Sequence, residues 1–271
     1  MSLFFFWRIL ILCFLSVPLY SWEVSHEEAE SIGKRIFLNE CSSNPDKLIW
    51  WNDGEHFASL GIGHFIWYPK GAHGSFEEMF PSLISFFKEK GIDMPGWLAL
   101  NNGCPWTSKE EFMEKKQEAK KKELQALLLR TISWQAVFIA QRFNQALPQL
   151  LADLSEEKKN HILKQVEKLG TPQGKYALLD YLNFKGRGSL ETERYQGKGW
   201  GLRQVLEEMP NQVKKGTGNV DDPVACFAQA AKALLKQRVQ NAPPERHEER
   251  WLPGWLARID SYLLKAHGEN Q

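Results

Sequence analysis

The sequence is poor in cysteine and has no excess of charge of either sign. Its 271 residues include four cysteines, and 34 lysines and arginines stand against 33 aspartates and glutamates, for a net charge of +1. Because proteins that bind nucleic acid usually need a basic face, this balance argues against a nucleic-acid partner. There is no CxxC pair and no Cys/His spacing suited to zinc, so we expect neither a metal nor another cofactor.

Internal repeats, low-complexity tracts and long linkers are also lacking. Residues 22–271 are therefore expected to form a single domain, and we expect a monomer. Residues 1–21 have the pattern of a targeting segment, because Arg8 precedes an apolar run over residues 9–19 that is too short for a full membrane span. We predict a signal peptide there, or an N-terminal membrane anchor if it is not cleaved, and hence a periplasmic or secreted protein.

Export permits disulfide bonds, but the cysteines after the targeting segment are odd in number: Cys41, Cys104 and Cys226. At most one intramolecular bridge can therefore form. A bridge between Cys41 and Cys104 would brace the segment around Glu40, and free buried thiols are the equal alternative.

What the sequence does contain is a set of amphipathic patterns with helix-capping residues. The hydrophobic content of 43%, with 11 Trp and 16 Phe, is ample for a packed core. Turn-rich, β-prone residues occur over 52–65 and predict a small hairpin. The expected class is mainly α (α+β), with helices near residues 25–38, 76–90, 108–132, 133–147, 155–169, 172–181, 223–239 and 255–265.

Residues 39–65 hold the candidate active site. Glu40 ends an apolar helical pattern, and burial among apolar neighbours favours the protonated form of a carboxyl group. A protonated carboxylic acid is what glycoside hydrolysis needs to protonate the leaving oxygen. Asp53 and Glu55 precede Ser59 by six and four residues, so on an extended arm they would share its face. Either is a candidate second carboxylate, and Glu55 is preferred because it is nearer the glycine turn.

The sequence SLGIGH at residues 59–64, placed after Glu40, resembles the catalytic corner of the lysozyme-like superfamily, especially the phage-type lysozymes. In those enzymes a helix-borne glutamate faces a hairpin that reads T-I-G-x-G-H. The NFKG motif from Asn183 to Gly186 is similar to a turn that lines the far wall of their cleft and of the cleft of lytic transglycosylases. Residues 202–206 follow this turn at a typical distance, and residues 254–262 look like their terminal helix.

The resemblance implies a bilobed fold with a hairpin beside the cleft, and cleavage of cell-wall peptidoglycan with Glu40 as general acid. The helix end at Glu40, the turn at residues 59–64 and Asn183 should then meet in one cleft, with His64 in a structural role there. The residues assigned to catalysis are Glu40, Glu55, Asp53 and Ser59. Those assigned to substrate binding are Trp50, Trp51, Gly61, Gly63, His64, Trp67, Tyr68, Asn183, Gly186 and Tyr195.

The chain also departs from the phage-type pattern. The interval from Glu40 to Ser59 is longer, serine replaces the commoner threonine, and the helical region at about 107–170 is enlarged. The second carboxylate, and the choice between hydrolase and transglycosylase, therefore stay open. Two further alternatives are a non-catalytic protein that binds the cell wall and a hydrolase of chitin or chitosan.

Overall fold

The computed structural model describes residues 23–99, 103–210 and 222–264. Over these residues the protein is mainly helical with a small antiparallel sheet, which confirms the expected class. The predicted targeting segment lies outside the described residues. The α-helices are α1 (His26–Cys41), α2 (Phe80–Glu89), α3 (Gly96–Ala99), α4 (Lys109–Met113), α5 (Glu118–Arg130), α6 (Ile132–Leu151), α7 (Glu156–Lys168), α8 (Pro172–Lys185), α9 (Leu202–Glu208), α10 (Pro223–Asn241) and α11 (Leu252–Ser261).

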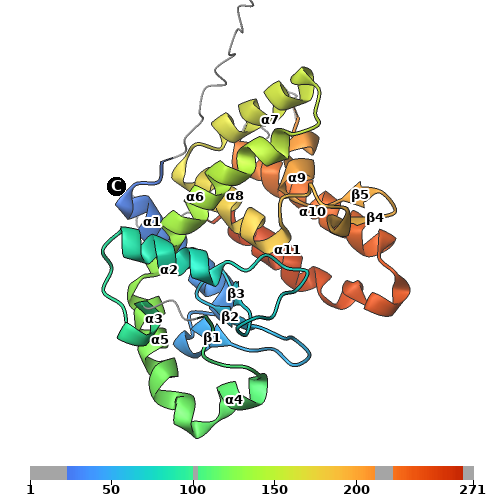
Figure 1. Cartoon of the computed structure of the whole chain (residues 1–271). Coiled ribbons are helices and arrows are strands. Elements are labelled where there is room, and N and C mark those ends of the chain that lie inside the picture. Colours follow the sequence, from blue (N-terminus) through green and yellow to red (C-terminus); the bar gives the residue numbers. More distant parts are fainter. Residues whose placement is uncertain (1–22, 100–102, 211–221, 265–271) are drawn as a thin grey trace, which may run out of the picture.

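The elements gather in two groups (Figure 1). Helices α2 to α5 surround a small sheet in the lower part of the view, and α7 to α11 form the upper part. Helix α1 lies along α6, which also contacts α2 on one side and α8 on the other. The long α6 therefore belongs to both groups. Short 3₁₀ helices connect the elements at Pro45–Leu48, Lys115–Gln117, Glu191–Glu193, Pro244–Arg246 and Glu248–Arg250.

The predicted hairpin is a three-stranded antiparallel sheet. Ser59 lies opposite both Trp50 and Ile66, so these three side chains share one face of the sheet. Leu60 and Phe65 point to the other face and are fully buried in the core. The strands follow one another in the order β1 (Ile49–Trp50), β2 (Ala58–Leu60) and β3 (Phe65–Trp67).

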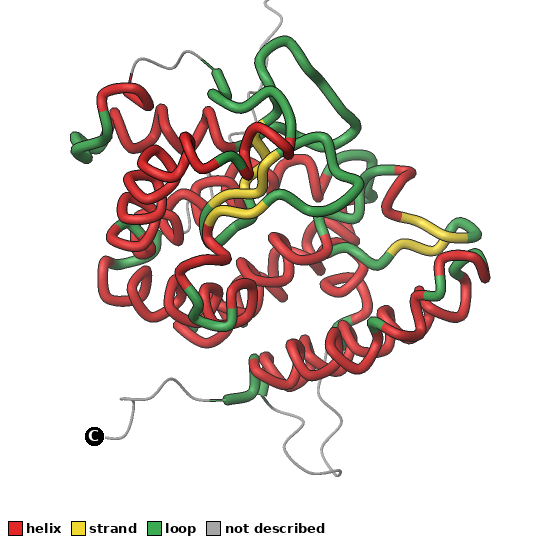
Figure 2. The backbone as a smooth tube through the Cα atoms, turned by 90° about the horizontal axis from the view of Figure 1, so that it is seen from below, coloured by secondary structure: helices red, strands yellow, loops and turns green. Residues whose placement is uncertain are grey.

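A second, two-stranded ladder forms within residues 187–200. Its strands are β4 (Arg194–Tyr195) and β5 (Lys198–Gly199). Seen from below, this ladder lies at the edge of the molecule, whereas β1–β3 are enclosed by helices and loops (Figure 2). The two sheets thus play different parts: one is packed into the core and the other is peripheral.

Helix α1 starts at a capping box and buries one face. The hydroxyl of Ser25 accepts from the backbone amide of Glu28, whose carboxylate accepts in turn from the amide of Ser25. Ala29 and Ile36 are buried on the inner face. A Cβ at Gly33 would lie 2.8 Å from a methyl carbon of Ile132, so glycine is what lets α1 approach α6 this closely.

The turn between β2 and β3 is fixed to α6 by a buried amide. Gln135 is fully buried, and its Oε1 accepts from the backbone amide of Ile62 at 2.9 Å. Its Nε2 donates to the carbonyl of Leu128 at 2.7 Å. Gly61 has φ +72° and its Cα faces the Gln135 amide, so this close contact needs glycine. The turn that carries His64 is therefore held by the helix behind it.

Most predicted helix starts are confirmed. The side chains of Ser108, Ser155, Thr171 and Asp222 each accept from a backbone amide of the first turn that follows. Proline occupies the first helical position after Thr171 and after Asp222, where its missing N–H costs nothing.

Several predicted boundaries are wrong. The helix expected over residues 108–132 breaks into α4, a 3₁₀ turn and α5, with the chain extended at Glu114. Pro148 does not end its helix, because α6 continues to Leu151. The last helix begins at Leu252, earlier than expected, and Asn183 lies within α8, two residues before its end. In the described ranges, no helix is long and apolar enough to cross a membrane.

Candidate active site

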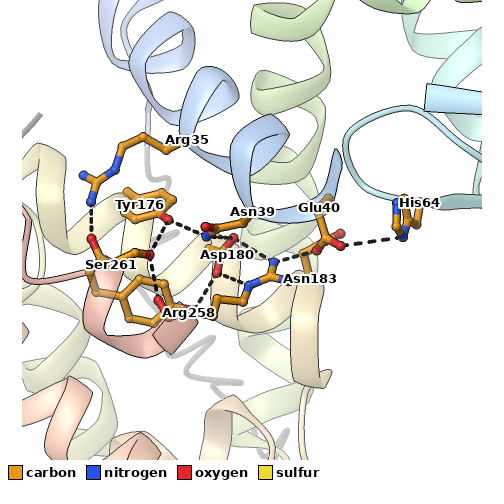
Figure 3. Close-up of polar contacts among 10 residues, drawn as sticks. Arg35, Asn39, Glu40, His64, Tyr176, Asp180, Asn183, Arg258 and Ser261 are labelled. Atoms are coloured by element: carbon orange, nitrogen blue, oxygen red, sulfur yellow. Dashed lines mark hydrogen bonds and ion pairs between the residues drawn. The ribbon is translucent and has the colours of Figure 1, made fainter. Parts of the chain in front are cut away.

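Glu40 lies in the last turn of α1 with a side chain that is 13% exposed. One carboxylate oxygen, Oε1, accepts from Nη2 of Arg258 at 2.5 Å and from Nδ2 of Asn183 at 3.3 Å. The other, Oε2, faces Nδ1 of His64 at 3.6 Å (Figure 3). Residues from α1, α8, α11 and the β2–β3 turn thus meet at one carboxyl group, and the expected convergence of Glu40, His64 and Asn183 is confirmed.

The ring of His64 faces Glu40, and 42% of its side chain is exposed. The residue has φ +46°, in the left-handed region that non-glycine residues rarely adopt. The turn thus holds an imidazole beside the candidate acid with one side open to solvent.

Behind Glu40 is a buried network centred on Asp180. The Asp180 side chain has no exposed surface and accepts from Nε and Nη2 of Arg258, both at 2.8 Å. The hydroxyl of Tyr262 donates to it at 2.6 Å, and the Asn39 amide lies 3.4 Å away and also donates to Tyr176. Although burial opposes its charge, Asp180 and then Glu40 raise the pKa of Arg258 well above the usual value. The guanidinium is therefore fixed in both position and charge.

A buried lysine lies beside this network. Nζ of Lys185 sits 3.4 Å from the ring centroid of Trp255 and 3.9 Å from that of Phe184. Burial, together with the charges of Arg238 and Arg258, lowers the pKa of Lys185 to about 6. The amine is accordingly mostly uncharged at neutral pH.

An open cavity of about 270 Å³ lies on the far side of Asn183. It is lined by residues of β3, α6 and α8 and by the segment that follows α8. Ile66 in its wall shares a sheet face with Ser59, so Ser59, 7% exposed, lies on the cavity side of the sheet. Gly186 also lines the cavity, beside the carboxylate of Glu193. Glu40 is not among the lining residues, and Asn183, which donates to its Oε1, connects the carboxyl group to this groove.

The structure does not bring Asp53 or Glu55 to Glu40. The Asp53 side chain is fully exposed and pairs with Lys109 at 2.5 Å, and Glu55 accepts from Asn52. Both lie in the loop that enters β2, whereas His64 follows the opposite end of that strand. The spacing prediction failed because residues 51–57 form a loop and not an extended arm. The partners that Glu40 contacts in the described chain include neither carboxylate.

Several predicted substrate-binding residues have structural roles. Trp51 and Trp67 are 3% exposed and Tyr68 is 5% exposed, so their rings cannot stack on a sugar. The Cα of Gly63 packs against the ring of Phe65. The Tyr195 hydroxyl donates to Glu248 and accepts from Arg246. Trp50 differs, because it is 51% exposed and lies on the Ser59 face of the sheet.

The cysteines do not form the bridge that was one of the two alternatives. Cys41, Cys104 and Cys226 are buried, and none of them is joined to another by a disulfide. Burial raises the pKa of Cys41 to about 12, and the charge of Glu40 adds to the effect. Across the described ranges, no group of three or more His, Cys, Asp or Glu side chains could hold a metal ion.

Sequence reasoning missed Asp180 and Lys185 and gave Arg258 no role of its own. One signal was available: Asp180 and Asn183 are three residues apart on one helix, which places them on the same face. The sequence gives no local signal that Lys185 is buried, because residues of α10 and α11, far away in the chain, pack against it.

No protein-family model, no curated protein and no solved structure matches the chain. The chemistry of the site has to be derived from its own residues.

We predict that Asp180→Asn destabilises the fold by about 3–5 kcal/mol, because it leaves the Arg258 charge buried without its main partner. The measurement is the free energy of unfolding in urea. Asp260→Asn is the matched control, since Asp260 of α11 is an exposed partner of Lys232 of α10 and its loss should cost about 0–1 kcal/mol. Equal losses in the two variants would contradict a special role for Asp180.

We predict a pH-dependent gain in stability from Lys185→Met. The folded chain holds the pKa of Lys185 near 6, so between pH 6 and about 10.4 the unfolded chain binds the extra proton. The resulting loss of stability is complete below pH 6 and absent above pH 10.4. The variant should melt higher than the wild type at pH 6 and at about the same temperature near pH 10.4. Lys164→Met, at an exposed position, should show no such trend, and a pH-independent gain in Lys185→Met would contradict the assignment.

Proposed function

We propose that the protein cleaves the glycan strands of peptidoglycan, with Glu40 as general acid. The observation that carries this proposal is the nearly buried Glu40 carboxyl group, held by Arg258 and by Asn183, which itself lines an open groove. The lysozyme-like resemblance supports it, because the motifs around Glu40, His64 and Asn183 come together over more than 140 residues of sequence. In this proposal the protein is exported to reach its substrate.

The site suits the first step of glycosidic cleavage. Glu40 would donate its proton to the leaving oxygen as the bond to the anomeric carbon breaks. The carboxylate left behind would accept hydrogen bonds from Arg258 and Asn183, which already point at Oε1. Because Asp180 fixes the guanidinium in advance, this stabilisation needs no rearrangement when charge develops.

The second step favours a transglycosylase. Asp53 pairs with Lys109 and Glu55 accepts from Asn52, both in the loop that enters β2, so we take neither as the group that activates a water. The sugar's own primary hydroxyl can instead attack the anomeric carbon, and the Glu40 carboxylate takes up its proton. The acid is thereby regenerated and the product carries an internal anhydro ring.

The alternatives on the same scaffold predict different products. A hydrolase of chitin or chitosan would use the same acid on another polymer, and a protein that only binds the wall would release no fragments. Zymography on purified cell walls, chitin and chitosan, with mass analysis of the products, separates these outcomes. Soluble anhydro-muropeptides are the result expected here. Release of reducing fragments from chitosan alone would overturn the peptidoglycan assignment.

We predict that Glu40→Gln lowers the cleavage rate by about 10²–10⁴-fold while the fold is kept. The amide preserves shape and can still accept from Arg258, but it has no acidic proton to give. The rate is measured as muropeptide release from purified walls, with circular dichroism as the check on folding. A variant that cleaves at the wild-type rate would refute the assignment of Glu40.

We predict that Asp53→Asn and Glu55→Gln keep cleavage within about threefold of the wild-type rate, because general base catalysis is worth at least about 10²-fold where it operates. The products should retain the anhydro ring. A loss of activity as large as that of Glu40→Gln, with hydrolytic products, would instead identify the affected residue as the second carboxylate and the protein as a hydrolase.

A further inference from the structure

The groove beside Asn183 carries two arginines from separate elements. Arg142 projects from α6 and Arg187 comes from the turn after α8, and both line the cavity of about 270 Å³. Two carboxylates, Glu77 and Glu193, also line it. The charges therefore balance in number, and what matters is how they are paired.

The pairing leaves one arginine without a partner. Glu77 pairs with Arg142 at 2.9 Å. The Glu193 carboxylate accepts from the backbone amide of Leu190 at 3.0 Å. Within the described residues, the guanidinium of Arg187 has neither a hydrogen bond nor an ion pair, although its backbone carbonyl accepts from the amide of Arg203. The guanidinium of Arg187 therefore faces the cavity without a polar partner from the described residues.

The two guanidinium groups also act on each other. Burial lowers the pKa of Arg142, and the charge of Arg187 lowers it further while Glu77 opposes both. Two like charges held near each other in a partly buried groove attract an anion, because a bound carboxylate relieves their repulsion.

We infer that this groove binds an acidic peptide attached to the glycan, with a peptide carboxylate on Arg187. The inference rests on the function proposed above and adds the substrate group that the groove selects. The planar guanidinium presents two parallel donors to a carboxylate, which a neutral sugar does not match. The amide side chains of Gln145 and Gln149 in the same wall can bond to peptide groups. A cationic polymer such as chitosan would be repelled at this point.

The test compares two forms of one substrate. Glycan strands with intact peptides are assayed beside the same strands after an amidase has removed the peptides. We expect Arg187→Gln to lower kcat/KM about tenfold on the peptide-bearing strands and to leave it unchanged on the stripped strands. Arg187→Lys should recover part of the lost kcat/KM, because lysine restores the positive charge but not the two parallel donors of the guanidinium.

Arg250→Gln is the matched control, because it removes the same charge from an exposed position outside the groove. It should leave kcat/KM on both substrates at the wild-type level. A loss in Arg187→Gln that is equal on both substrates, or no loss on either, would overturn the inference. Melting temperature is recorded for each variant, so that an unfolded protein is not mistaken for a lost contact.

A binding measurement separates this inference from the proposed function. With Glu40→Gln as the background, so that nothing is cut, binding of peptide-bearing strands is followed by calorimetry with and without Arg187→Gln. One outcome is that peptide-bearing strands bind more tightly with Arg187 present than after Arg187→Gln, while the wild-type protein cuts neither substrate. That outcome would refute the cleavage proposal and support the peptide site. If the wild type cuts both substrates and Arg187→Gln leaves the binding affinity unchanged, the cleavage proposal is supported and the peptide site is refuted.

Discussion

The rest of the site depends on the burial of one guanidinium group. Arg258 is 10% exposed, and a charge taken out of water is tolerated only when acceptors surround it. Asp180 provides two of these acceptors and Glu40 a third. Helices α1, α8 and α11 are therefore joined at this point by charge. The orientation of Glu40 follows from the same arrangement, because its Oε1 completes the coordination of Arg258.

Asn183 and His64, which both face the Glu40 carboxyl group, are held in different ways. On the α8 side, Asn183 is carried by the helix that also carries Asp180, so it is tied to the ionic network. On the sheet side, the turn with His64 depends on a neutral hydrogen bond from Ile62 to Gln135 of α6. Helix α6 extends along both groups of elements. The relative placement of His64 and Asn183 around Glu40 is thus set largely by one helix.

Local features of the sequence predicted local structure well. Caps such as Thr171 followed by Pro172 act within one turn, and so they were readable without the fold. Glu40 and Asn183 were found because their motifs lie close to helix ends. The extended arm expected for Asp53 was wrong, because spacing constrains side chains only on regular elements, and residues 51–57 form a loop. The burial of Lys185 and Arg258 was not predictable, because it depends on contacts between helices far apart in the chain.

The buried thiol of Cys41, next to Glu40, reacts slowly with oxidants and alkylating reagents. Thiolates, and not thiols, react with oxidants and alkylating reagents, and burial holds the pKa of Cys41 near 12. An unpaired cysteine can therefore persist at this position in an oxidising compartment while the end of α1 stays packed. The rate at which Cys41 is modified in the native protein therefore measures how often the last turn of α1 separates from the core.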